Sequence, residues 1–498
     1  MLAAFIRDSI PTALPGSRAF MSAKHAVLKE VFGFDSFRPG QEHIADCLLT
    51  GRNVLAVMPT GAGKSLTYQV PALVKGGLTV VVSPLVALMH DQVAALKLAG
   101  VAAETINSSA SRDENVAIWR RVAAGQVRIL YMAPERLMTE RMIGALQRIG
   151  VSLFAIDEAH CISQWGASFR PEYDMLQDLR TAFPGVPIGA VTATADEATR
   201  RDIVAKLFAG DGEVYVAGFD RPNISLTVEP KANTKKQLLA FLDGREEQSG
   251  IVYALSRRSS EELATFLSGQ GHRAVPYHAG LTPEQRAETQ NLFMTEPGVI
   301  VCATIAFGMG IDKPDVRFVA HLDLPKSVEG YYQETGRAGR DGEPSTAWLA
   351  YGLQDVVQQR RMIAEGDGDA QRKRNQTLHL DAMLALCETV ECRRQQLLAY
   401  FGEPSERCGN CDTCLTPPDS YDGTVPAQKL LSTIVRLQRE RRQAFGAGHL
   451  VDILVGADTE RIRTQGHDRL ATYGIGSDLP AAQWRGIVRQ LLAQARTT

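Results

Sequence analysis

A glycine-rich segment near residue 60 has the residue types of a phosphate-binding loop, in the order Thr60-Gly61-Ala62-Gly63-Lys64-Ser65. Glycines let backbone amides approach phosphate oxygens, a lysine can reach the terminal phosphates, and a serine hydroxyl can bind Mg²⁺. Met58 stands where the general pattern has its first glycine. An ordinary glycine turn is the alternative, but a predicted strand before the segment and a predicted helix after it favour a nucleotide site.

Two adjacent acids follow a later apolar run, in the order Asp157-Glu158-Ala159-His160. An acid at the carboxyl end of a strand can hold the Mg²⁺ of a phosphate site, and a neighbouring carboxylate can take a proton from the attacking water. We therefore expect Asp157 and Ser65 to bind Mg²⁺ and Glu158 to act as the base. A surface carboxylate pair is the alternative, and the preceding phosphate loop disfavours it.

A second glycine-rich segment carries two arginines three residues apart, in the order Gln333-Glu334-Thr335-Gly336-Arg337-Ala338-Gly339-Arg340. Guanidinium groups offered to the γ-phosphate from another domain stabilise the charge that develops in the transition state. A solvated basic loop is the alternative. If Arg337 and Arg340 reach the nucleotide, two domains share the site, and hydrolysis changes their relative position as in a motor.

Five of the eight cysteines lie between Cys387 and Cys414. Four of them have spacings that tetrahedral Zn²⁺ accepts, namely Cys392, Cys408, Cys411 and Cys414. Cys387, five residues before Cys392, is the rival for the fourth ligand.

The elements that position these residues are predicted by short Val- and Ile-rich runs that alternate with longer helix-like segments. Parallel sheets buried on both faces give this pattern. The predicted strands are 53–58, 78–83, 127–132, 153–157 and 188–192, then 251–255, 274–278, 299–304, 316–322 and 346–350. We expect an α/β protein with a disordered extension over 1–20, domains over 21–219 and 220–352, a helical zinc module over 353–416 and a helical unit over 425–498.

Composition excludes several classes of protein. The 498 residues carry 54 Lys and Arg against 56 Asp and Glu, and 45% are apolar, which is typical of a globular protein. Apolar runs are too short for a membrane span, so we expect a cytoplasmic protein with no membrane partner. Residues 425–498 hold 11 basic against six acidic residues, a local excess that suits contact with nucleic acid.

Together these motifs resemble the RecQ family of superfamily 2 DNA helicases, in the family's order, from about residue 28 to 492. The resemblance implies two RecA-like domains, a zinc-binding module and a winged helix, and 3′ to 5′ unwinding of DNA with ATP and Mg²⁺. The segment 32–41 is similar to the family's adenine motif, in which Gln41 would pair with the base while Phe34 and Arg38 sandwich it. The Cys-Arg-Arg context of the zinc module favours Cys392 over Cys387.

The segment 161–171 resembles the family's aromatic-rich loop, and it implies that Trp165, Phe169 and Arg170 bind single-stranded DNA. This chain has Ala167-Ser168 where family members usually have His-Asp. Two further residues are implied at the nucleotide, Asp312 and Gln333.

Residues 425–498 resemble the start of the winged helix, without the β-hairpin wing that separates the duplex. The resemblance implies single-stranded and tailed duplex DNA as partners, single-stranded DNA-binding protein as a further partner, a monomer, association with the bacterial nucleoid, and a role in repair and recombination. An RNA helicase or remodeller is one alternative. A DNA-dependent ATPase or annealing scaffold with weak unwinding is the other.

Overall fold

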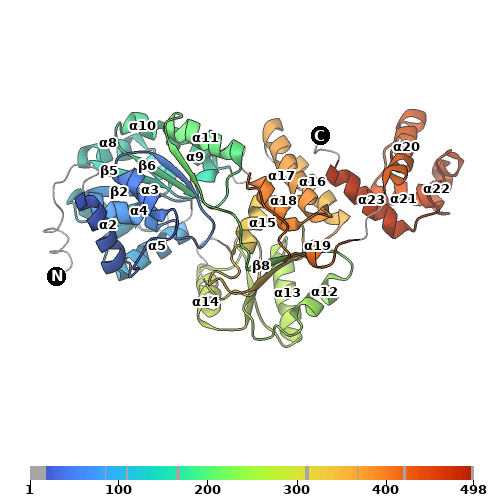
Figure 1. The fold of residues 1–498 in the computed structure, drawn as a ribbon, viewed down its shortest axis with the longest axis horizontal. Helices are drawn as coiled ribbons and strands as arrows, with labels where there is room; N and C mark the ends of the chain where they lie inside the picture. The colour runs from blue at the N-terminus through green and yellow to red at the C-terminus, as the bar shows by residue number, and fades with distance from the viewer. Residues whose placement is uncertain are drawn as a thin grey trace.

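The computed structural model describes residues 18–84, 86–107, 110–163, 169–308, 313–366, 368–418 and 422–494. Two parallel sheets, each flanked by helices, form two lobes that are followed by helices alone (Figure 1). Among the described residues, no helix is both long and apolar enough to cross a membrane. The predicted residues Trp165, Ala167, Ser168 and Asp312 lie outside the described part of the chain, as do residues 1–17.

The first lobe is built on a seven-stranded parallel sheet in the order β3-β4-β2-β5-β6-β1-β7. Its inner strands are apolar and buried, as expected for a sheet covered by helices on both faces. The strands are β1 (Val54–Val57), β2 (Leu78–Val82), β3 (Ala103–Ile106), β4 (Ile129–Met132), β5 (Val151–Ile156), β6 (Ile188–Thr192) and β7 (Glu213–Val216). The helices are α2 (Arg18–Glu30), α3 (Gln41–Leu49), α4 (Leu66–Lys75), α5 (Val86–Leu98), α6 (Arg112–Ala123), α7 (Pro134–Leu137), α8 (Glu140–Ile149), α9 (Pro171–Asp174), α10 (Leu179–Ala182) and α11 (Glu197–Phe208).

The second lobe is built on a six-stranded parallel sheet in the order β10-β11-β9-β12-β13-β8. Its strands are β8 (Ile224–Pro230), β9 (Gly250–Tyr253), β10 (Arg273–Tyr277), β11 (Val299–Ala303), β12 (Phe318–His321) and β13 (Ser345–Tyr351). Its helices are α12 (Thr234–Leu242), α13 (Arg257–Gly269), α14 (Pro283–Thr295) and α15 (Val328–Thr335). The start of α14 shows how sequence sets a boundary, because Thr282 and Gln285 cap each other's backbone amides and Pro283 opens the helix.

The predicted strands are confirmed, with shifts of at most two residues at their ends. Three strands were missed, namely β3, β7 and β8. The polar residues 229–233, which no predicted strand includes, begin inside β8, whose pairing with β13 continues to Pro230. Proline fits there because β8 lies at the edge of its sheet.

Helices make up the rest of the described chain. They are α16 (Leu353–Glu365), α17 (Ala370–Glu388), α18 (Arg393–Tyr400), α19 (Asp412–Leu415), α20 (Thr424–Arg441), α21 (Ala447–Val455), α22 (Glu460–Gln465) and α23 (Ala481–Gln494). Figure 1 shows α16 to α18 beside the second lobe and α20 to α23 beyond them, at the end of the molecule farthest from the first lobe. α23 packs on α17, and Trp484 in its first turn is fully buried.

Candidate functional site

The glycine-rich loop lies between β1 and α4, so the N-terminus of α4 faces any anion bound there. Gly61 and Gly63 both have positive φ angles, of 85° and 74°, a conformation that residues with side chains rarely adopt. A Cβ atom on Gly63 would lie 2.5 Å from the Gln41 amide nitrogen. Lys64 Nζ donates back across the loop to the carbonyls of Met58 (3.3 Å) and Pro59 (3.4 Å). The ammonium group therefore already lies over the space that the loop encloses.

The adenine motif contacts the phosphate loop directly. Gln41 Nε2 donates to the carbonyls of Ala62 (2.9 Å) and Gly63 (3.0 Å), while Arg38 Nη1 donates to the carbonyl of Gly61 at 2.5 Å. Gln41 is 1% exposed, whereas Phe34 is 47% exposed. The structure thus brings Arg38 and Gln41 to the loop and leaves the ring of Phe34 open to solvent.

The two predicted acids follow β5, next to the phosphate loop. Burial and the neighbouring Glu158 raise the pKa of Asp157, while Lys64 opposes that rise. Glu158 has φ 48° and ψ 46°, a left-handed conformation that is uncommon for a residue with a side chain and is often found at functional sites. Two half-buried carboxylates beside a lysine, one of them on a residue with an uncommon backbone conformation, form a site that a divalent cation would stabilise.

A chain of polar contacts leads from Glu158 in the first lobe to the second lobe. The Glu158 carboxylate lies 3.3 Å from His160 Nδ1, and the same ring nitrogen lies 2.8 Å from the Thr192 hydroxyl. Thr192 donates to the Thr194 carbonyl at 3.1 Å, and Gln333 Nε2 of α15 donates to the Thr194 hydroxyl at 2.9 Å. Burial lowers the pKa of His160 and favours the neutral ring, while the nearby Glu158 opposes that shift. Gln333, expected at the nucleotide, here joins the two lobes.

The two predicted finger arginines have different surroundings. Arg337 is buried in the second lobe, where its Nε donates to the Tyr253 hydroxyl at 3.0 Å and its Nη1 donates to the Gly308 carbonyl. Arg340 crosses to the first lobe, because a Cβ atom on Gly61 would lie 3.6 Å from its Cγ. Of the two, Arg340 is the one that reaches the phosphate loop.

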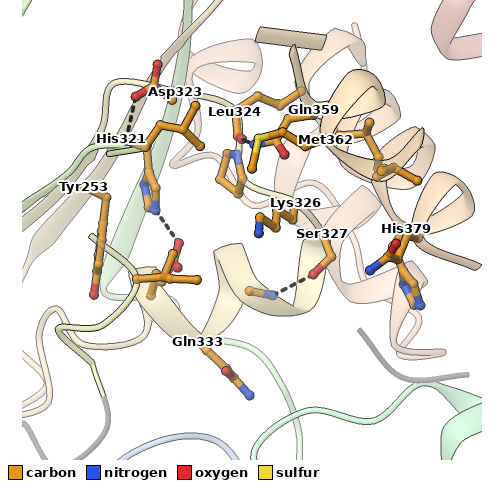
Figure 2. Close-up of a pocket in the computed structure, with 18 of the residues that line it drawn as sticks. Tyr253, His321, Asp323, Leu324, Lys326, Ser327, Gln333, Gln359, Met362 and His379 are labelled. Carbon is orange, nitrogen blue, oxygen red and sulfur yellow. Dashed lines mark hydrogen bonds and ion pairs between the residues drawn. The ribbon is translucent and has the colours of Figure 1, made fainter. Parts of the chain in front are cut away.

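A cavity of about 700 Å³ lies where the two lobes meet α16 and α17. Glu158, His160 and Arg170 line it from the first lobe, and Gln333 and Arg337 line it from the second. Figure 2 shows Gln359 and Met362 of α16 and His379 of α17 along the same wall. The cavity therefore borders Glu158, the contact between the lobes and the helical module.

The described ends of the aromatic-rich loop are held by the first lobe. Arg170 Nη1 donates to the carbonyl of Pro84 at 3.1 Å, so its guanidinium is fixed at the cavity wall. The ring of Phe169 lies under Lys206, with the ammonium 5.9 Å from the ring centroid. Arg170 is thus placed at the cavity, while Phe169 packs toward α11.

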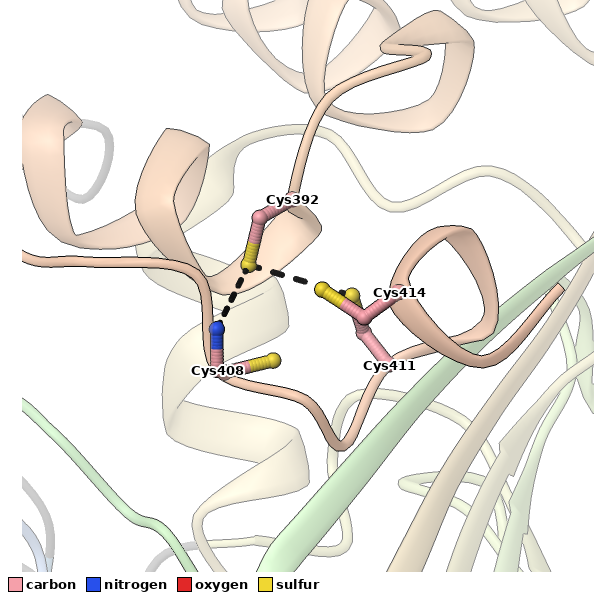
Figure 3. A group of neighbouring side chains, drawn as sticks. All are labelled: Cys392, Cys408, Cys411 and Cys414. Atoms are coloured by element: carbon pink, nitrogen blue, oxygen red, sulfur yellow. Dashed lines mark hydrogen bonds between the residues drawn. The ribbon is translucent and has the colours of Figure 1, made fainter. Parts of the chain in front are cut away.

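The four predicted cysteines come together and Cys387 is not among them (Figure 3). Their sulfur atoms lie within 4.8 Å of one another, and Cys411 Sγ is 3.9 Å from Cys392 Sγ. Tetrahedral Zn–S bonds of about 2.3 Å place sulfurs roughly 3.8 Å apart, so the group fits Zn²⁺. Burial raises the pKa of Cys411, but hydrogen bonds led by that from Thr413 outweigh it and lower the pKa to about 6, which favours the thiolate that zinc needs.

The cysteine module is docked on the connection between the lobes, which the sequence did not reveal. Arg394 pairs with Asp220 at 3.1 Å, and the Glu403 carboxylate accepts from the backbone amide of Phe219. The rings of Phe401 and Phe219 stack with centroids 4.4 Å apart. The sequence marked Arg394 only as part of the Cys-Arg-Arg context, because nothing local indicates that it meets a residue 174 positions away.

Comparison with known proteins places these motifs in one family. The chain matches the DEAD/DEAH box helicase family over residues 38–203, the helicase conserved C-terminal domain over 231–342, the RecQ zinc-binding family over 353–415 and the RQC domain over 417–495. Among solved structures, Mss116p bound to single-stranded RNA and AMP-PNP superposes with a TM-score of 0.57 at 15% identity, over 89% of this chain and 93% of that one. At that identity the likeness concerns the fold alone.

Curated relatives give the same result with greater detail. The ATP-dependent DNA helicase RecQ of Pasteurella multocida is 45% identical over 94% of this chain and 73% of that protein. The enzyme of the same name from Bacillus subtilis is 38% identical over 90% of this chain and 76% of that protein. The chain belongs to the RecQ family of ATP-dependent DNA helicases.

Proposed function

We propose that this helicase translocates 3′ to 5′ on single-stranded DNA and unwinds duplexes at an ATP site formed by both lobes. The observation that carries the proposal is the position of Arg340, which belongs to the second lobe and lies over Gly61 of the first. An arginine that must cross between lobes to reach the nucleotide makes hydrolysis depend on lobe closure, and release of the products then frees the lobes to separate.

Within this site Lys64 binds the terminal phosphates and Ser65 and Asp157 bind Mg²⁺, which supplies positive charge opposite the phosphates when present. Glu158 orients the attacking water and takes its proton. Arg340 stabilises the transition state directly, and Arg337 supports it from inside the second lobe, where Tyr253 holds its guanidinium.

The adenine ring would lie beside the exposed face of Phe34 and the guanidinium of Arg38. For Gln41 to reach the base, its side-chain amide must leave at least one of the two loop carbonyls that it now contacts. Adenine binding is then coupled to the conformation of the phosphate loop, so recognition of the base by Gln41 can influence how the loop binds the phosphates. Asp312 remains a proposed contact of the ribose or the arginine network.

We propose that single-stranded DNA reaches the cavity between the lobes. Cys161 and Arg170, near the two ends of the aromatic-rich loop, line that cavity, and Lys326 and Arg372 add positive charge to its wall. A base stacked on Trp165, with Arg170 on the backbone, would then lie against the wall that carries Glu158 and His160. Phe169 would stack on a second base once its ring has left Lys206.

Cellular roles are inferred from the relatives. We propose that the protein acts as a monomer in repair and recombination, in the cytoplasm near the nucleoid, with single-stranded DNA-binding protein as a partner. The names of the curated relatives favour DNA over RNA as the substrate and do not favour the weakly unwinding scaffold.

The test uses labelled duplexes with a 3′ tail or a 5′ tail and the full chain with ATP and Mg²⁺. We expect unwinding of the 3′-tailed duplex and little of the 5′-tailed one. The ATPase rate is measured alongside with single-stranded DNA or RNA of the same sequence, and DNA should stimulate it more. Preference for the 5′ tail would overturn the direction, and equal stimulation by RNA would favour a remodeller.

A further inference from the structure

A second group of metal-ligating side chains lies in the first lobe, far from the cysteine module in sequence. His43 and Cys47 stand four residues apart on α3, so they share one face of the helix. That face meets Glu213, the first residue of β7 at the edge of the sheet. Two elements separated by about 170 residues thus bring an imidazole, a thiol and a carboxylate together.

The three ligand atoms have the separations that a small cation requires. Cys47 Sγ lies 3.3 Å from Glu213 Oε2 and 3.9 Å from His43 Nε2, and His43 Nε2 contacts Glu213 Oε1. All three atoms lie within 4.8 Å of one another. Bonds of about 2.0–2.3 Å in a tetrahedron place such atoms roughly 3.2–3.7 Å apart, so small rotations of the side chains would suffice.

Access and charge also suit a metal. The Cys47 side chain is buried, whereas those of His43 and Glu213 are 49% and 31% exposed, which leaves the outer side open to an ion and a water ligand. A thiolate and a carboxylate together neutralise a divalent cation. Arg52 Nη1 donates to Glu213 Oε2 at 2.5 Å, whereas His43 contacts the other carboxylate oxygen, Oε1. With zinc bound, Arg52 could keep this hydrogen bond and so orient the carboxylate.

We propose that His43, Cys47 and Glu213 form a second zinc site, with water as the fourth ligand. Sulfur, nitrogen and oxygen in one group select zinc over Mg²⁺ or Ca²⁺, which prefer oxygen alone. Bound zinc would fasten β7 to α3, the helix whose first residue, Gln41, contacts the phosphate loop. The proposal does not depend on how ATP or DNA is bound.

Zinc content of the full chain tests the site. The purified protein is incubated with excess Zn²⁺, separated from free metal by gel filtration and analysed for zinc per chain. The wild type should hold two zinc ions and Cys47→Ser one, since the four-cysteine group is unchanged. Cys302→Ser, a matched loss of a buried thiol outside the group, should still hold two. A wild type that holds one zinc, or a Cys47→Ser protein that holds two, would overturn the proposal.

A spectroscopic readout separates this site from metal adsorbed on surface histidines. With the four-cysteine group filled by zinc, added Co²⁺ should give a thiolate charge-transfer band and tetrahedral d–d bands in the wild type. Cys47→Ser should lose the charge-transfer band, and His43→Asn and Glu213→Gln should weaken Co²⁺ binding. Circular dichroism confirms that each variant is folded. Co²⁺ spectra that are the same in wild type and Cys47→Ser would mean that only the ion pair of Arg52, His43 and Glu213 exists there.

Discussion

The contact between Gln333 and Thr194 gives the sharpest test of how the two lobes cooperate. Gln333 Nε2 donates to the Thr194 hydroxyl at 2.9 Å, and Thr194 is 2% exposed. Replacing Gln333 by alanine removes this bond and leaves the rest of α15 unchanged. Because the bond joins the two lobes, its loss should reduce the population in which they are in contact and with it the rate of hydrolysis.

The size of the effect follows from the kind of bond. A hydrogen bond between neutral side chains contributes about 0.5–1.5 kcal/mol net. Since about 1.4 kcal/mol changes a rate or an equilibrium tenfold, kcat for DNA-stimulated ATP hydrolysis should fall roughly 2- to 13-fold. The KM for ATP should stay within about twofold, because the amide does not contact the nucleotide in this account.

Steady-state ATPase assays with saturating single-stranded DNA measure both constants for Gln333→Ala, Thr194→Val and the double variant. The double variant should be no slower than the worse single variant, because each removes the same bond. Gln359→Ala is the matched control. Gln359 of α16 also lines the cavity, but its amide donates to the Leu324 carbonyl of the second lobe and makes no hydrogen bond to the described part of the first lobe.

Two outcomes would refute this reasoning. A raised KM for ATP with an unchanged kcat would show that Gln333 binds the nucleotide, as the sequence predicted. Fully additive losses in the double variant would show that Gln333 and Thr194 act independently.

Other residues should respond in distinct ways. Arg340→Ala should lower kcat roughly 10³-fold or more, because it removes an arginine finger, and should leave Tm unchanged. Arg337→Ala should lower both kcat and Tm, because it removes a buried side chain and its hydrogen bonds. If the two variants show the same changes in kcat and Tm, the distinction between the two arginines is wrong. After dialysis against a chelator strong enough to empty a three-ligand site, Cys411→Ala should lack the zinc that Cys387→Ala retains, and the reverse in metal analysis would make Cys387 the ligand. Trp165→Ala should hydrolyse ATP at a rate that DNA no longer raises; full stimulation would remove the loop from the coupling.

Much of the fold was predictable because the inner strands of a parallel sheet are continuous apolar runs. The three missed strands lie at or beside solvent-facing edges, where that rule weakens. β7 alternates exposed and half-buried residues, and β8 carries Ser225, Thr227 and Glu229. β3 has only four residues and includes Glu104, whose carboxylate is buried because it pairs with Lys97 and Arg121. Such tertiary pairing cannot be read from a single segment.

In the candidate site, too, some residues could be predicted from the sequence and others could not. The phosphate loop and Asp157 were predictable because each follows a strand directly and its residue types alone specify the chemistry. The roles of Gln333, Arg337 and Arg340 depend instead on how the lobes dock. Both arginines were assigned the same role because they lie three residues apart in one glycine-rich segment. Only the structure shows that one is buried within its own lobe and the other crosses to Gly61.

Docking of the cysteine module on the connection between the lobes has a mechanical consequence. Phe219 is packed against Phe401 and Tyr332, and Asp220 is paired with Arg394, so the residues between β7 and β8 have little freedom to flex alone. If one lobe moves relative to the other, the zinc module must therefore move with one of the lobes or serve as the point about which they rotate. The zinc site then contributes to the stability of the hinge as well as to its own module.

Unwinding of a 3′-tailed DNA duplex by the full chain, compared side by side for the wild type and Lys64→Ala, tests the central claim most directly. The wild type should separate the strands only when ATP and Mg²⁺ are present. Lys64→Ala should still bind the tailed DNA but neither hydrolyse ATP nor separate the strands, because the ammonium that lies over the phosphate loop is gone. Strand separation without ATP, or unwinding by Lys64→Ala at the wild-type rate, would contradict it.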